Sequence, residues 1–207
     1  MVYEPRLFLD VSWLGQRLVR VTASISGGLA VASGEDFAAD GVGTGSVASF
    51  NEASYEVLVV VLGDRLALSR LRADPDDPVI NPPDFSSAVV EVTSFAPQLG
   101  VVHRQVLRML GIDPSDPRDD ALDETAVLNP GALVRLECLG ALHLIFAAAT
   151  ASAVGSGVGG AGYAQRASMY RERFAAERSR VSVLIDTDGD GEPEATRRPG
   201  VGHLIRG

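Results

Sequence analysis

The pattern in this chain that comes closest to a known chemistry is the acidic run DTDGDG at residues 186–191. Carboxylates at alternate positions can converge on one hard cation, and glycine permits the bend, as in the first half of an EF-hand calcium loop. Asp186, Asp188 and Asp190 would be the ligands. The second half of the pattern fails, because Arg197 stands where a bidentate glutamate belongs. We therefore favour a tight acidic turn and keep calcium binding as the alternative.

The other motifs in the sequence do not point to catalysis. Residues 155–160 match G-x-G-x-x-G, but they follow a predicted helix rather than a strand, so we interpret them as a linker. His103, His143 and His203 are far apart, with no nucleophile at a recognisable spacing. A Ser–His–Asp site assembled by folding stays a competing hypothesis, since such triads are geometric. We predict that the protein is not an enzyme and has no cofactor other than the calcium ion considered above.

Composition narrows the classes of partner. With 46% hydrophobic and 22% charged residues, the 207-residue chain is typical of globular proteins. A net charge of −9 argues against non-specific adhesion to DNA or to an anionic membrane. The single cysteine, Cys138, excludes an intramolecular disulfide framework and lies in an apolar run, where we predict a buried thiol. Residues 1–10 lack the apolar core of a signal peptide, so secretion is not expected.

One apolar stretch resembles a membrane span. Residues 133–154 are rich in apolar and small side chains, whereas a spanning helix needs about 20 predominantly apolar residues. Arg135, Glu137 and His143 interrupt the stretch, which then becomes mostly alanine before reaching Ser and Gly. We predict a helix that is buried or faces another subunit, and no contact with a membrane.

Up to residue 96 the sequence predicts strands. Short apolar runs alternate with turn residues, and the Leu14-Gly15 and Gly63-Asp64 pairs have the length of hairpin loops. Gly- and Pro-rich connections cover 41–46 and 74–85. The strands are expected over 6–13, 16–24, 29–33, 56–62, 65–71 and 88–93. The fold class is therefore α+β, with an N-terminal antiparallel β-rich domain over 1–96.

After Pro97 the apolar spacing shifts towards the helical period. A helix is expected over 98–110 with Gly111 as its C-cap, and a second opens at Asn129-Pro130, with asparagine as cap and proline in the first turn. A third covers 163–180. Strands over 181–186 and 194–198 then flank the acidic turn. The second domain, 97–207, is helical and ends in a β-hairpin and a tail, 199–207, that has little to pack on within its own chain.

Residues 129–200 resemble a known family. A helix opening at Asn129-Pro130, a small-residue linker, the segment YAQRASMYRERFAAERSRV and then LIDTDGDGEPEATRRPG follow one another. This order resembles the C-terminal region of the head–tail connector (adaptor) proteins of tailed bacteriophages and gene-transfer agents. The match covers roughly a third of the chain. The β-rich domain departs from the family, whose members are often mainly helical.

The resemblance implies a non-enzymatic structural protein of the virion, assembled in the host cytoplasm. Its copies would form a ring, typically a dodecamer, in the neck below the portal. The expected partners are other copies of the chain, the portal protein and tail or stopper proteins, while DNA passes through the lumen without sequence-specific binding. The docking residues would be Arg197, Arg198, Pro199, His203, Leu204, Ile205 and Arg206. The main alternative is a calcium-dependent binding module that uses Asp186–Gly191.

Overall fold

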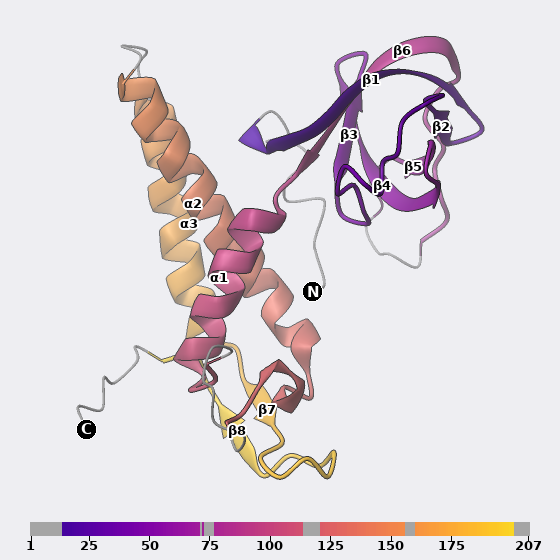
Figure 1. The fold of residues 1–207 in the computed structure, drawn as a ribbon. Helices are drawn as coiled ribbons and strands as arrows, with labels where there is room; N and C mark the ends of the chain where they lie inside the picture. Colours follow the sequence, from indigo (N-terminus) through magenta and orange to yellow (C-terminus); the bar gives the residue numbers. More distant parts are fainter. Residues whose placement is uncertain (1–13, 71, 73–76, 114–120, 156–159, 201–207) are drawn as a thin grey trace. The chain divides into compact units, whose positions relative to one another are not determined.

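The computed structural model describes residues 14–70, 72, 77–113, 121–155 and 160–200, drawn in colour in Figure 1. The chain is α+β and divides into two compact units, one ending at Phe95 and the other beginning at Ala96. The first unit contains strands, and the second contains three long helices and a β-hairpin.

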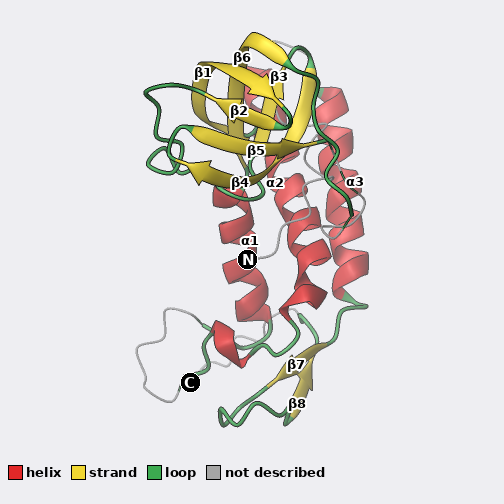
Figure 2. Cartoon of the chain, turned by 90° about the vertical axis from the view of Figure 1, so that its right-hand side faces the viewer, coloured by secondary structure: helices red, strands yellow, loops and turns green. Residues whose placement is uncertain are grey.

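The first unit is a closed six-stranded antiparallel barrel in the order β1-β2-β5-β4-β3-β6, with β6 pairing back onto β1. Closure gives each strand two neighbours, which protects edges that would otherwise pair with other chains. Figures 1 and 2 show the strands curving around one interior. The strands are β1 (Gln16–Ser26), β2 (Leu29–Val31), β3 (Val47–Phe50), β4 (Ala53–Leu62), β5 (Arg65–Ser69) and β6 (Phe85–Ser94).

The barrel interior is filled by alternate side chains of each strand. Leu66 and Leu68 of β5 are buried, as their period-2 spacing predicts, and Val90 and Val92 of β6 face the same core. Phe37, from the loop between β2 and β3, is fully buried in this cluster. The barrel is therefore a packed core rather than an open channel.

Most of the predicted strands are confirmed. The strands expected over 16–24, 29–33, 56–62, 65–71 and 88–93 correspond to β1, β2, β4, β5 and β6, and the Gly63-Asp64 hairpin is present. The prediction missed β3, whose VASF sequence is too short to show an alternation. The turn after β3 also lacks the glycine that usually marks a hairpin in the sequence. Its two residues are Asn51 and Glu52, which take positive φ values of 47° and 63°. The strand predicted over 6–13 lies outside the described residues.

The second unit is built on three helices. These are α1 (Ala96–Met109), α2 (Val134–Gly155) and α3 (Ala161–Arg178). α2 packs against both of the others, and they meet at Gly140, where an added Cβ would lie 2.7 Å from Val102 Cγ1 and 3.1 Å from Phe174 Cε2. Gly140 therefore permits the close approach of α1 and α3 to the same turn of α2.

The start of α2 differs from the prediction. A short 3₁₀ turn, η4 (Pro130–Leu133), precedes the helix, and the Asn129 side chain makes no capping hydrogen bond. Instead the Asn129 carbonyl oxygen accepts from the Leu184 N–H at 2.8 Å, and its amide nitrogen donates to the Ser182 carbonyl at 3.2 Å. Asn129 thus fastens the C-terminal hairpin, and the prediction that it caps the helix is wrong.

The C-terminal hairpin consists of β7 (Val183–Ile185) and β8 (Ala195–Arg197), as predicted. A third segment joins it, because Val127 pairs with Ile185 directly after the 3₁₀ turn η3 (Glu124–Ala126). The Leu128 N–H donates to the Leu184 carbonyl at 3.0 Å and the Asp186 N–H to the Ala126 carbonyl at 2.9 Å. The segment around η3 therefore connects the hairpin to the helices.

The two halves of α2 differ in burial. Side chains from Leu136 to Leu142 are buried, as is Cys138, whereas from residue 147 onward Ala153 is the buried one among the described residues. Figure 1 shows α2 and α3 continuing as a pair past the start of α1. The helical segment Pro130–Gly155, which comprises η4 and α2, is long and apolar enough to cross a membrane. Half of its most apolar stretch is buried within the protein.

Candidate functional site

The acidic turn is closed by its own first residue. Asp186 follows β7, and its Oδ1 accepts from the backbone N–H of Asp188 at 3.2 Å and of Gly189 at 2.6 Å, while Oδ2 accepts from the Gly191 N–H at 2.8 Å. These hydrogen bonds, the one from Gly191 first, lower the pKa of Asp186 below its usual range. Gly189 and Gly191 have φ values of 81° and 88°, which glycine adopts without strain.

Four carboxylates come together at this turn. One oxygen each of Asp186, Asp188, Asp190 and Glu194 lies within 4.8 Å of the others. Oxygen ligands of this kind are what Ca²⁺ and Mg²⁺ prefer in proteins. The sequence prediction missed Glu194, which the pairing of Ile185 with Ala195 brings opposite Asp186. The signal that could have identified Glu194 is the register of the hairpin. The sequence predicted the two strands but not which of their residues pair. We call these four residues the acidic cluster.

The structure also brings together a histidine and two glutamates that the sequence prediction did not connect. His103 of α1 has its Nδ1 2.7 Å from Glu137 Oε1 of α2, and its Nε2 3.1 Å from Glu124 Oε2 of η3. The side chain of Glu137 is 5% exposed, that of His103 24% and that of Glu124 67%. Because His103 and Glu137 are 34 residues apart, no local spacing could have revealed the pair.

The environment of these groups shifts their pKa values upward. Burial by itself lowers the pKa of His103, but hydrogen bonds and charges from Glu137 and Glu124 outweigh it, and the pKa lies above the usual 6.5. For Glu137, burial raises the pKa above the usual 4.5, against the opposing effect of His103. The folded unit therefore retains protons that the unfolded chain would release.

A cavity of about 440 Å³ adjoins this histidine. Its polar wall is formed by His103, Glu124, Thr125 and Glu137. Its apolar wall comes from α1, the residue after η3, η4 and the start of α2, with side chains from Leu107, Val127, Pro130, Leu133 and Val134. Among the residues that line it, none pairs a nucleophilic side chain with His103, whose two nitrogens both contact carboxylates.

The predicted docking residues divide into three groups. Arg197 Nη1 donates to the Leu110 carbonyl at 2.7 Å, and Pro199 is buried. Arg198 is exposed. His203, Leu204, Ile205 and Arg206 lie outside the described residues. The Gly200 N–H donates to the Met109 carbonyl at 3.4 Å, so the expectation that the tail has little to pack on from Pro199 onward is wrong for its first two residues.

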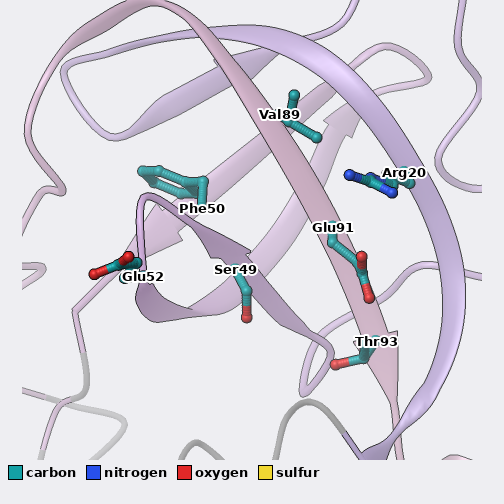
Figure 3. A pocket seen from close by; sticks show the side chains of 7 residues that line it. All are labelled: Arg20, Ser49, Phe50, Glu52, Val89, Glu91 and Thr93. Atoms are coloured by element: carbon teal, nitrogen blue, oxygen red, sulfur yellow. The ribbon is translucent and has the colours of Figure 1, made fainter.

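The barrel carries a shallow hollow of its own. Figure 3 shows the seven side chains that line this volume of about 370 Å³, with Arg20 of β1 beside Glu91 of β6. These two residues are cross-strand partners on the outer face. The lining is completed by Ser49, Phe50, Glu52, Val89 and Thr93. Charges of both signs and two hydroxyl groups share this open surface, and none of these seven residues is a histidine or cysteine.

His143, the second of the three histidines, makes a structural contact. His143 Nδ1 lies 3.0 Å from the Ala167 carbonyl oxygen, which joins α2 to α3 beside the stacked rings of Phe146 and Tyr170. His203 lies outside the described residues, so the structure brings no two of the three histidines together within the part it describes. No protein-family model, curated protein or solved structure matches the chain.

Proposed function

We propose that this protein is a non-enzymatic structural component of a virion, a head–tail connector (adaptor) subunit that assembles with copies of itself into a ring below the portal. The observation that carries the proposal is the part of the helix pair that contains the second half of α2 and the start of α3. This part is apolar, uncharged and uncovered. The order of elements in residues 129–200 supports the same class of protein.

The surface formed by the second half of α2 and the start of α3 is unusual for one that faces solvent. No charged residue occurs over 144–165, although 22% of the chain is charged. On α2, Leu144, Ala148, Ala151 and Val154 follow one another at helical spacing, and all four are partly or fully exposed, with Val154 at 68%. Exposed helices in monomers normally carry charges on such a face. We call this surface the uncharged arm.

The net charge of the chain explains why the uncharged arm is suited to self-association. Two copies with a net charge of −9 repel each other, so they approach most closely where no charge faces the partner. Alanine on such a face allows helix axes to come close together, as in tightly packed helix pairs. A membrane anchor would instead be expected to present large apolar and aromatic side chains.

The proposal is tested by measuring the mass of the full chain in solution by light scattering, alone and with portal rings. We expect a ring-sized species, or a monomer that assembles on the portal, and expect Ala151→Glu to abolish assembly while the chain keeps its helical content by circular dichroism, since Ala151 is exposed. Ala175→Glu, at an exposed alanine in the charged part of α3, is the matched control. A wild-type chain that stays monomeric with the portal, or an Ala151→Glu variant that assembles normally, would overturn the proposal.

The second candidate is a calcium-dependent binding module, and the acidic cluster favours it. Calorimetric titration with Ca²⁺ tests this function, with Asp188→Asn/Asp190→Asn as the variant because both side chains are exposed and Asp186 still closes the turn. Glu192→Gln removes a charge from the same loop without touching the cluster and serves as control. We expect binding in the wild type and the control and its loss in the double variant. Absence of heat in the wild type sinks this candidate.

A further inference from the structure

His103 bridges two carboxylates that belong to different elements. Glu137 lies on α2 and is almost wholly buried, whereas Glu124 belongs to η3 and has a side chain that is 67% exposed. These are the charged groups that act on the imidazole; Arg104, the next residue of α1, points to solvent, and Asp123 accepts from the Thr125 N–H instead. His103 thus joins η3 to α1 and α2.

The bridge requires a protonated ring. An imidazolium has two N–H donors and can serve both carboxylates, but a neutral imidazole has one donor and one lone pair. After deprotonation, one of the two contacts faces a carboxylate oxygen with a lone pair and becomes repulsive. The buried Glu137 keeps the one remaining N–H donor, because an unpaired charge in the interior is strongly unfavourable. The exposed Glu124 can instead be hydrated by water, so the contact with Glu124 is the one that breaks.

The segment that Glu124 anchors also holds the C-terminal hairpin. Directly after η3, Val127 pairs with Ile185, and two backbone hydrogen bonds join Ala126 to Asp186 and Leu128 to Leu184. The hairpin is also held by the Asn129 side chain, which bonds the backbone of Ser182 and Leu184, and by Arg197, which donates to the Leu110 carbonyl. Breaking the Glu124 contact therefore removes one of several ties, and we expect loosening rather than detachment.

We propose that His103 is a proton-operated clasp, which when charged holds η3 and the attached β7–β8 hairpin against α1 and α2, and when neutral releases Glu124 and loosens both. The clasp also forms the polar wall of the cavity lined by Leu107 and Leu133, so its release changes that wall. The proposal does not depend on the connector function.

The direction of the response follows from proton linkage. The folded-state pKa of His103 lies above its unfolded value of 6.5, so the stabilisation is complete below that pH and is lost as pH rises through the folded value. The raised pKa of Glu137 acts in the same direction. The clasp is therefore closed in mild acid and opens at neutral to alkaline pH.

Amide hydrogen exchange of the full chain, followed by mass spectrometry from pH 6 to 9 and corrected for intrinsic rates, tests the clasp. We expect the protection of peptides covering 121–129 and 183–197 to fall by up to about tenfold per pH unit above the His103 pKa, the limit for release of one proton. Peptides from the barrel should keep constant protection. A profile that is flat with pH in the wild type would overturn the proposal.

Glu124→Gln separates the clasp from a general effect of pH. Because its side chain is exposed, the variant is expected to fold, and its amide, which can accept from the charged ring or donate to the neutral one, should make the protection independent of pH. The His103 pKa, followed by its ring proton resonances, should fall in this variant. Glu172→Gln, an exposed glutamate of α3, is the matched control. An unchanged pH profile in Glu124→Gln would show that His103 does not act through Glu124.

Discussion

At the scale of single residues, the clearest local strain is at Glu52. This residue and Asn51 form the two-residue turn between β3 and β4 with positive φ at both positions, a conformation that favours Asn followed by Gly. Asparagine tolerates it, but a glutamate in the left-handed region costs roughly 1–2 kcal/mol. Nothing in the hydrogen bonds of the described residues requires a carboxylate there, so the strain is not offset locally.

Replacing Glu52 by glycine is therefore expected to stabilise the barrel. We expect Glu52→Gly to raise the free energy of unfolding by about 0.5–1 kcal/mol, since relief of strain is partly cancelled by the greater freedom of glycine in the unfolded chain. Urea unfolding of the full chain measures it. Asn51→Gly, in the same turn, should have a smaller effect because asparagine already accepts this conformation. Equal stability of Glu52→Gly and wild type would show that the turn is not strained.

Residue-level chemistry was only partly predictable from the sequence. The acidic run identified Asp186, Asp188 and Asp190 because carboxylates two apart share one side of a turn, but Glu194 joins them through the hairpin register. Asn129 has the right residue type for a cap, yet its amide binds the backbone of β7. In both cases a contact between segments distant in sequence decided the role, and local spacing does not encode such contacts.

At the scale of elements, strong periodicity was the reliable signal. β5 and β6 alternate apolar residues and α1 repeats them at helical spacing, and all three were predicted because the pattern lies within one element. β3 was missed because four residues are too few for a period, and barrel closure could not be predicted because β1 and β6 pair across most of the unit.

For α2, the burial predicted from its sequence differs from the burial that the structure shows. Its sequence is apolar on all sides, which predicts burial on several faces. The structure covers its first half with α1 and α3, and in the second half, past the start of α1, most of the described side chains are partly or fully exposed. The pattern therefore indicated a helix that must be covered, while the exposed half is the place where we propose that a second molecule binds. This difference is the reason that self-association is the function we propose.

At the scale of the whole molecule, the raised pKa values found among the described residues lie in one of the two units. His103 and Glu137, the groups with raised pKa values, belong to the helical unit. The buried glutamate of the barrel, Glu56, is instead paired with Arg72 at 2.6 Å. Two units with separate cores are expected to unfold in separate steps. Stability of the helical unit should therefore depend on pH near neutrality, and that of the barrel should not.

Differential scanning calorimetry of the full chain between pH 6 and 9 tests this division. We expect two transitions, of which one keeps its midpoint while the other moves to lower temperature as pH rises, by about 4–8 °C for each kcal/mol lost in a unit of this size. His103→Gln should reduce the movement of this transition in this range, because the imidazole proton is then no longer gained or lost at the clasp. Arg104→Gln, at the adjacent exposed position of α1, should leave the shift intact. If both transitions moved together, or if a single transition accounted for all the heat, the two units would share one cooperative core and the clasp would act on the entire chain.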